Sequence, residues 1–269
     1  MRLSGLGIYA LFYLVFLYAP IVLLPIFAFN DATIIALPLS GFTTHWFAEL
    51  WTNTALHAAV GNSLQIAVTA AVIATLLGIC AARAGAQHSF PGKGPIIGFI
   101  MLPLVLPEII IAVSLLVILV QILGLELSNW TVIAAHVLIC TPFSIAILNG
   151  AFANLDPSLE EAGLDLGESR WSAFRLITLP LVMPGIISSL LIAFTISLDE
   201  FIIAFFLTGS NPTMPVYIWS LNKDFDALPV VMALGTILVA LSITLLTIAE
   251  YFRRRGLARS GQKDTGGFL

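Results

Sequence analysis

Six long apolar stretches dominate the chain, and each has the roughly 20 residues that a helix needs to cross a bilayer. They cover residues 7–29, 63–82, 103–123, 130–150, 184–207 and 230–252. Only 10% of the residues are charged, whereas a soluble domain carries about 25%, so the chain cannot cover a globule with polar surface. The pattern therefore predicts an all-α integral membrane protein with six transmembrane helices. The first stretch is too long for the apolar part of a signal peptide, so we expect it to be retained.

The third stretch departs from a simple span. From Pro95 to Leu125 only Glu108 is charged, and this apolar run is longer than the roughly 20 residues of one straight span. Pro103 and Pro107 interrupt it, so we expect a short interfacial piece followed by the span proper.

Basic residues set the expected orientation. With six spans both termini lie on the same side of the membrane, and every Lys and Arg except Lys223 falls on that side. The positive-inside rule therefore places both termini in the cytoplasm and residues 30–61 on the opposite side.

One polar segment lies between the fourth and fifth stretches, and it reads LEEAGLDLGESRWSAFRLITLP from Leu159. Asp156 before it is a good N-cap, and Pro157 suits the first position of a helix. Apolar or small residues then recur at helical spacing, at Leu159, Ala162, Gly163 and Leu166. We expect a short amphipathic helix over residues 157–167 that projects into the cytoplasm.

This helix has three possible roles: a solvated connector, a helix lying on the lipid, or a docking element for a cytoplasmic protein. Helices on a lipid surface usually carry Lys and Arg on the polar face. Here the polar face is acidic and consists of Glu160, Glu161, Asp165 and Glu168. The acidic face therefore favours docking.

The same segment resembles the motif shared by permease subunits of bacterial ABC importers. That motif is Glu-Ala-Ala, three residues, Gly, nine residues, Ile, one residue and Leu-Pro. This chain matches every spacing, with Gly163 in place of the second Ala, through Glu161, Ala162, Gly163, Gly167, Ile177, Leu179 and Pro180. In that family the segment is the coupling helix, which docks on the ATPase subunit. The resemblance thus assigns ATPase coupling to Glu160, Glu161, Ala162, Gly163, Asp165, Gly167, Leu179 and Pro180.

Other stretches resemble permeases of the spermidine/putrescine class, among them TLPLVMPGI, SLDEFIIAFFLTG and GFTTHWF. The resemblance covers nearly the whole chain and implies a type I importer permease fold (MetI-like) in the bacterial inner membrane. It implies a first helix and periplasmic loop over residues 1–60, a permease core over 61–252 and a basic cytoplasmic tail over 253–269. The implied partners are an ABC ATPase dimer, a second homologous permease in a heterodimer, a periplasmic substrate-binding protein and membrane lipid, without nucleic acid.

The chain lacks a Walker A sequence, since Gly92-Lys93 is followed by Gly94 and has no earlier glycine at the required spacing. We therefore expect a subunit that is not an enzyme and binds no cofactor itself. ATP and Mg²⁺ would bind to the partner ATPase.

The third and fifth expected spans contain acids: Glu108 in the third, and Asp199 and Glu200 in the fifth. An ionised residue at the bilayer centre costs about 2.5–3.5 kcal/mol on insertion scales, so such residues usually face a cavity or a partner. A hydrated position near the outer interface is the alternative. No Lys or Arg lies within the six stretches to neutralise them, and a cationic substrate would do so.

The resemblance agrees, because polyamine permeases carry acids at these places, often Asp where this chain has Glu108 and Glu200. It predicts a substrate pathway that includes Trp46, Glu108, Ser197, Asp199 and Glu200. The face of Trp46 could hold an ammonium group, although an interfacial anchor is the alternative.

Other classes fit less well. Asp199 and Glu200 are adjacent and would point about 100° apart on a helix, and the chain has neither HExxH nor GxSxG, which argues against an intramembrane enzyme. A secondary transporter would show an internal repeat, and none is evident between residues 1–125 and 126–269. An importer permease for another small solute, such as a quaternary amine or an opine, remains an alternative.

We expect neither the two cysteines nor the four histidines to bind a metal; they are Cys80, Cys140, His45, His57, His88 and His136.

Overall fold

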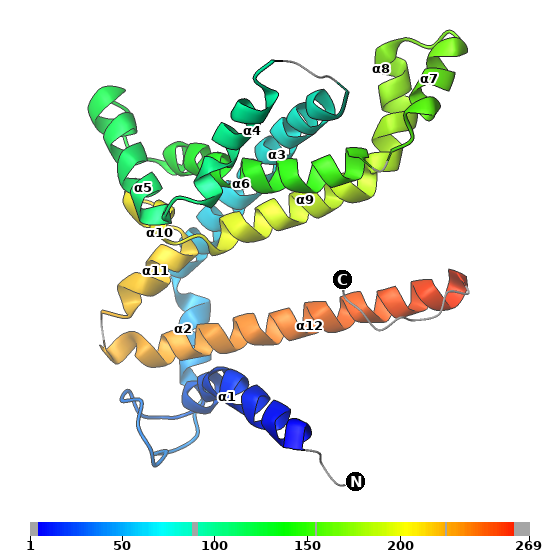
Figure 1. Cartoon of the computed structure of the whole chain (residues 1–269). Helices are drawn as coiled ribbons and strands as arrows, with labels where there is room; N and C mark the ends of the chain where they lie inside the picture. The colour runs from blue at the N-terminus through cyan, green and yellow to red at the C-terminus, as the bar shows by residue number, and fades with distance from the viewer. Residues whose placement is uncertain (1–4, 88–90, 154, 224, 261–269) are drawn as a thin grey trace. The chain divides into compact units, whose positions relative to one another are not determined.

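The structure, a computed structural model, describes residues 5–87, 91–153, 155–223 and 225–260 (Figure 1). The secondary structure of these residues is helical, with one isolated β-bridge between Asn30 and Phe42. Packing divides the chain into two compact units. One combines the N-terminal residues up to Thr54 with those from Ile218 onward, and the other spans Ala55–Tyr217.

The first unit is built on a long C-terminal helix. Its elements are α1 (Gly5–Ala28), α2 (His45–Thr52), η4 (Phe225–Ala227) and α12 (Leu228–Ser260). Both α1 and α2 pack against α12. The loop between α1 and α2 folds around Asn30, whose side-chain oxygen accepts hydrogen bonds from the backbone N–H and the hydroxyl of Ser40. Packing thus groups the last long helix with the first, although the two are far apart in the sequence.

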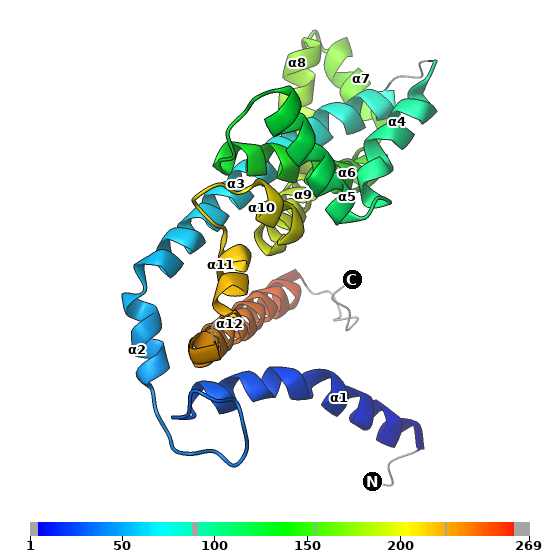
Figure 2. The same ribbon diagram turned by 90° about the vertical axis from the view of Figure 1, so that its left-hand side faces the viewer.

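Three long helices form the frame of the second unit: α3 (Thr54–Gln87), α6 (Asn129–Ala153) and α9 (Leu179–Asp199). Helices α6 and α9 run side by side, as both views show (Figures 1 and 2). A glycine permits the close approach, because a Cβ atom on Gly185 of α9 would lie only 2.5 Å from Ala151 Cβ of α6. Small residues at helix contacts are typical of membrane proteins, where packing rather than the hydrophobic effect holds helices together.

The expected third span, residues 103–123, is not one continuous helix, and the interruption that Pro103 and Pro107 predicted is present. The chain instead forms α4 (Lys93–Met101), η1 (Leu102–Leu104), α5 (Glu108–Leu116) and the π-helical η2 (Val117–Ile122). The pieces before and after residues 105–107 are bent by 99°. Pro107 has an extended backbone (φ −57°, ψ 131°) immediately before α5, which explains the break at the place where the prolines predicted one.

The expected fifth span, residues 184–207, is also wrong as a single helix. Helix α9 begins earlier, at Leu179, directly after α8 (Arg170–Ala173) and η3 (Phe174–Thr178). It ends at Asp199, and α10 (Ile202–Leu207) and α11 (Met214–Leu221) follow. The break lies at Glu200, whose backbone is extended (φ −69°, ψ 124°).

Among the residues that the structure describes, four helices are long and apolar enough to cross a membrane, or five if the bent pair counts as one span. The expected stretches 7–29, 63–82 and 130–150 are confirmed as parts of α1, α3 and α6. Within the described part of α12, Leu228–Thr244 is apolar. The total of six spans therefore stays a prediction.

The contact between Gly185 and Ala151 gives a test of the frame. Replacing Gly185 with Ala should lower the thermal midpoint of the solubilised protein, because forcing α9 away from α6 costs about 1–3 kcal/mol. Gly150→Ala is the matched control, since a Cβ atom there meets nothing within 4 Å. Equal midpoints for the two variants would contradict the packing of α6 on α9.

Candidate functional site

The polar segment between α6 and α9 forms the predicted helix, α7 (Pro157–Asp165). A side-chain hydrogen bond caps its first turn, and a glycine with a positive φ follows its last turn. The Asp156 carboxylate accepts a hydrogen bond of 3.0 Å from the backbone N–H of Ser158. This bond holds the pKa of Asp156 below its usual value, because it stabilises the charged form. The cap thus stabilises the helix above the unfolded pKa, and this contribution is lost as the pH falls through the lowered folded pKa.

Gly167 follows the C-cap residue of α7, Leu166, and has a φ of +90°. The N–H of Gly167 bonds to the carbonyl of Leu164 at 2.9 Å, and the N–H of Glu168 bonds to that of Gly163 at 3.2 Å. These two bonds are the Schellman arrangement, which needs a residue in the left-handed region. The motif glycine at position 167 therefore has a structural reason within this chain.

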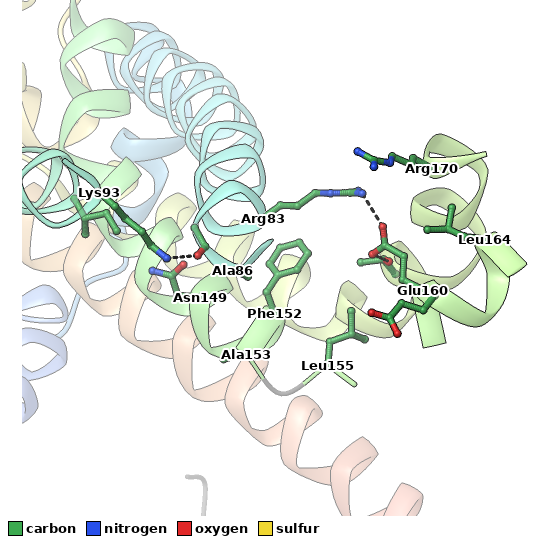
Figure 3. Close-up of a pocket in the computed structure, with 14 residues that line it drawn as sticks. Arg83, Ala86, Lys93, Asn149, Phe152, Ala153, Leu155, Glu160, Leu164 and Arg170 are labelled. Carbon is green, nitrogen blue, oxygen red and sulfur yellow. Dashed lines mark hydrogen bonds and ion pairs between the residues drawn. The ribbon is translucent and has the colours of Figure 1, made fainter. Parts of the chain in front are cut away.

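Glu160 fastens α7 to the helices behind it. Its Oε1 accepts from Arg83 Nη2 of α3 at 3.0 Å, and its Oε2 accepts from the Thr178 hydroxyl at 2.9 Å (Figure 3). The Arg83 guanidinium also lies 3.9 Å from the centre of the Phe174 ring, a cation–π distance. Both oxygens of Glu160 are thus hydrogen-bonded within the chain, whereas the family resemblance predicted that this residue couples to the ATPase.

Gly163 also faces inward. A Cβ atom on it would lie 2.7 Å from Cδ1 of Ile177, so two residues of the recognised motif contact each other. The end of an isoleucine side chain can move, so the Ala found at this position in the family requires only a small shift there.

The outer face of α7 is open. The predicted coupling residues on it are Glu161, Ala162, Asp165 and Gly167, and all are exposed, as is Pro180; Leu179 is half-buried. Two large apolar side chains next to them, Leu166 (87% exposed) and Trp171, are also exposed. The sequence analysis missed these two as contact residues, although their hydrophobicity beside an acidic helix was the available signal.

A pocket of about 770 Å³ lies behind α7 and is lined by residues of α3, α4, α6 and α7 (Figure 3). Its walls carry both signs of charge, from Arg83, Lys93, Arg170, Glu160 and Glu161. The Lys93 ammonium donates to the carbonyl of Gly85 at the end of α3. Arg83 crosses this pocket to reach α7, so the ion pair is the polar link between α7 and α3 (Figure 3).

The five predicted pathway residues fall into different environments. Glu108 is the first residue of α5 and Asp199 is the last residue of α9, and both are exposed at helix breaks. Neither carboxylate makes a hydrogen bond or an ion pair with any other residue that the structure describes. Glu200 and Ser197, in contrast, are only 7% and 4% exposed.

A buried histidine, His136, lies beside both Ser197 and Glu200. His136 Nδ1 of α6 lies 2.7 Å from Ser197 Oγ, and its Nε2 lies 3.3 Å from Glu200 Oε2. Glu200 also accepts from the N–H groups of Ile203 at 2.7 Å and Ala204 at 2.9 Å, so its carboxylate caps α10. The sequence analysis missed His136 in this role; the signal was one histidine in an apolar stretch of a chain that also holds acids in such stretches.

Trp46 lies in the first unit and is 9% exposed. Its indole N–H donates to the carbonyl of Asn30 at 2.8 Å, which ties α2 to the end of α1. Neither the pathway role nor the interfacial anchor is tested by this position, so both stay predictions.

Residues 74–257 match the family described as binding-protein-dependent transport system inner membrane component. The chain belongs to this family. It is 34% identical over 253 residues to the spermidine/putrescine transport system permease protein PotC of Shigella flexneri, covering 94% of this chain and 93% of the relative. It is also 36% identical over 249 residues to the putrescine transport system permease protein PotI of Escherichia coli K12, covering 89% and 87%.

Solved structures of this fold agree. A bacterial ABC transporter involved in the import of the acidic polysaccharide alginate has a chain that aligns with a TM-score of 0.72 and 20% identity, covering 93% of each chain. The resemblance to importer permeases of the polyamine class is thereby confirmed, and the protein is a multi-pass permease of the inner membrane rather than an enzyme.

The C-terminus of α7 in this permease gives a second test. Gly167→Ala should loosen α7, because an alanine in the left-handed region costs about 1–2 kcal/mol. Amide hydrogen exchange of the backbone in α7 should then speed up by about 5- to 30-fold. Gly167→Asn is the control, since Asn visits this region at less cost, and equal exchange in the Ala variant and the wild type would contradict the assigned cap.

Proposed function

We propose that this chain is the membrane-spanning subunit of an ATP-driven importer that carries polyamines, or similar small organic cations, into the cytoplasm. The observation that carries this proposal is the pair of exposed carboxylates, Glu108 and Asp199, at breaks between helices of an apolar chain. No Lys or Arg lies in the apolar stretches to pair with them. The printed names of the PotC and PotI relatives support the same class of substrate.

The charge of the substrate has to be argued from residues, since the fold is compatible with either sign. The aligned transporter imports an acidic polysaccharide according to its title. In this chain the exposed polar groups at the helix breaks are acids, which favour cations by simple electrostatics. Several weak sites suit passage better than one tight site, because a tight site would retain the substrate.

We place Glu108 and Asp199 along the route as the residues that meet the ammonium groups. Trp46 is proposed near the outer mouth. Ser197 and Glu200 belong to the same part of the pathway, but their burial puts them beneath its surface.

ATP hydrolysis would come from an ABC ATPase dimer that docks on the exposed face of α7, and this chain would bind neither ATP nor Mg²⁺. Support comes from the open face with Glu161, Ala162 and Asp165, and from the fixed inner face with Glu160 and Gly163. A helix that is anchored on one side and open on the other is suited to transmit force from a partner. It is the coupling helix in this proposal.

The remaining assembly follows from the family. We propose six spans with both termini in the cytoplasm, the sixth within α12, and a second homologous permease beside this one. A periplasmic substrate-binding protein would deliver the solute, and a solved relative of this fold was captured with such a protein.

The test is uptake by vesicles that carry the complete complex. Wild type should take up spermidine or putrescine only with ATP, while Asp199→Asn and Glu108→Gln should each slow uptake about 10-fold, for a loss of about 1.5 kcal/mol per charged contact. Glu126→Gln, at an exposed acid in the loop before α6, is the matched control and should transport normally.

Unchanged uptake in both pathway variants would remove the cation route. Transport restricted to neutral or anionic solutes would exclude polyamines while leaving the importer class intact.

A further inference from the structure

We propose that His136 is a positioning residue that fixes Asp199 at the surface of the pathway and holds Glu200 away from the substrate. This inference rests on the proposed function, because it assigns different roles to two adjacent acids of the same pathway. The decisive observation is that the imidazole of His136 contacts a residue on each side of Asp199: its Nδ1 is hydrogen-bonded to the hydroxyl of Ser197, two positions before, and its Nε2 lies 3.3 Å from Oε2 of Glu200, directly after, without hydrogen-bond geometry.

Glu200 is already satisfied within the chain. Its carboxylate accepts hydrogen bonds from the N–H groups of Ile203 and Ala204, one at each oxygen, and Nε2 of His136 lies 3.3 Å from Oε2. A buried carboxylate without such partners would be costly, so an ammonium group could bind it only by breaking the cap of α10. Partner subunits and lipid can only bury it further than its present 7% exposure.

Asp199 has the opposite environment. It is exposed and makes no ion pair within the described part of the chain, although it is covalently joined to Glu200. Successive residues at the end of a helix point in different directions, about 100° apart. Ser197 is hydrogen-bonded to the imidazole, and Glu200 caps α10 while it packs against the same ring. The backbone between them therefore has little freedom, and the Asp199 carboxylate is held facing outward.

A Ser–His–Glu arrangement also occurs in hydrolases, where the serine must be reachable by the substrate. Here Ser197 and His136 are buried, His136 completely. The geometry therefore serves to hold the break between α9 and α10 rather than to perform covalent chemistry.

The first experiment measures the position of residues 199 and 200 without any substrate. In the assembled complex with Cys80 replaced by Ser, Asp199→Cys should react with a cationic thiol reagent at least about 10-fold faster than Glu200→Cys, because an exposed thiol is accessible to the reagent whereas a buried one is inert. Equal rates at the two positions, or faster reaction at 200, would overturn the proposal whatever the transported solute is.

The second experiment asks whether His136 acts through Asp199. Two substitutions each place an amide at one of the two contacts: that of His136→Asn can replace Nδ1 toward Ser197, and that of His136→Gln can replace Nε2 toward Glu200. Both variants keep every acid. We expect the KM for spermidine uptake to rise about 10-fold in His136→Asn, which removes the contact with Glu200, and less in His136→Gln.

The double variant separates positioning from a general structural role. If His136 acts through Asp199, then His136→Asn should add nothing to the KM of Asp199→Asn, whereas independent effects would multiply. Multiplying effects, or a normal KM in His136→Asn, would refute the positioning role. Failure of the wild-type complex to transport any polyamine would instead refute the proposed function, and the thiol measurement would still decide the geometry.

Discussion

In a lipid environment every charge and every helix end needs a polar partner, because no water is available to supply one. The break after α9 shows how this chain meets that requirement. Glu200 accepts from the first free N–H groups of α10, and His136 of α6 accompanies the buried carboxylate. Asp199 and Glu108 are left exposed at the breaks, and we infer that a cationic solute meets them. The same constraint thus fixes both the local fold and the polarity of the route.

The polar segment that contains α7 also has some residues bonded within the chain and others exposed. Its inner residues, Glu160 and Gly163, bond or pack to α3 and η3. Other residues of the segment, such as Asp165 and Leu166, are exposed. A motif that is usually associated with a partner therefore contains both an attachment and a free surface. In the proposed coupling role, a load on α7 would reach the end of α3 through the Arg83–Glu160 pair.

Sequence patterns predicted the parts of the fold that depend on local chemistry. The cap, proline and glycine around α7 located that helix, and continuous apolar runs located α1, α3 and α6. The break at Glu200 could not be found in this way, since residues 186–208 contain neither Gly nor Pro. The histidine that lies beside this break, His136, is 61 positions from Ser197 in the sequence. Glu160 was assigned to the ATPase for the same reason, because Arg83 is 77 positions away.

The central claim is that this chain passes energy from a cytoplasmic ATPase into a membrane pathway through the open face of α7. The most direct measurement places a photoreactive benzoylphenylalanine at Leu166 in the complete complex within native membranes, with Val105, another exposed apolar residue, as the control position. Illumination should join position 166, and not 105, to the ATPase subunit. Crosslinks from position 166 to lipid or to the periplasmic binding protein, without the ATPase, would contradict the account.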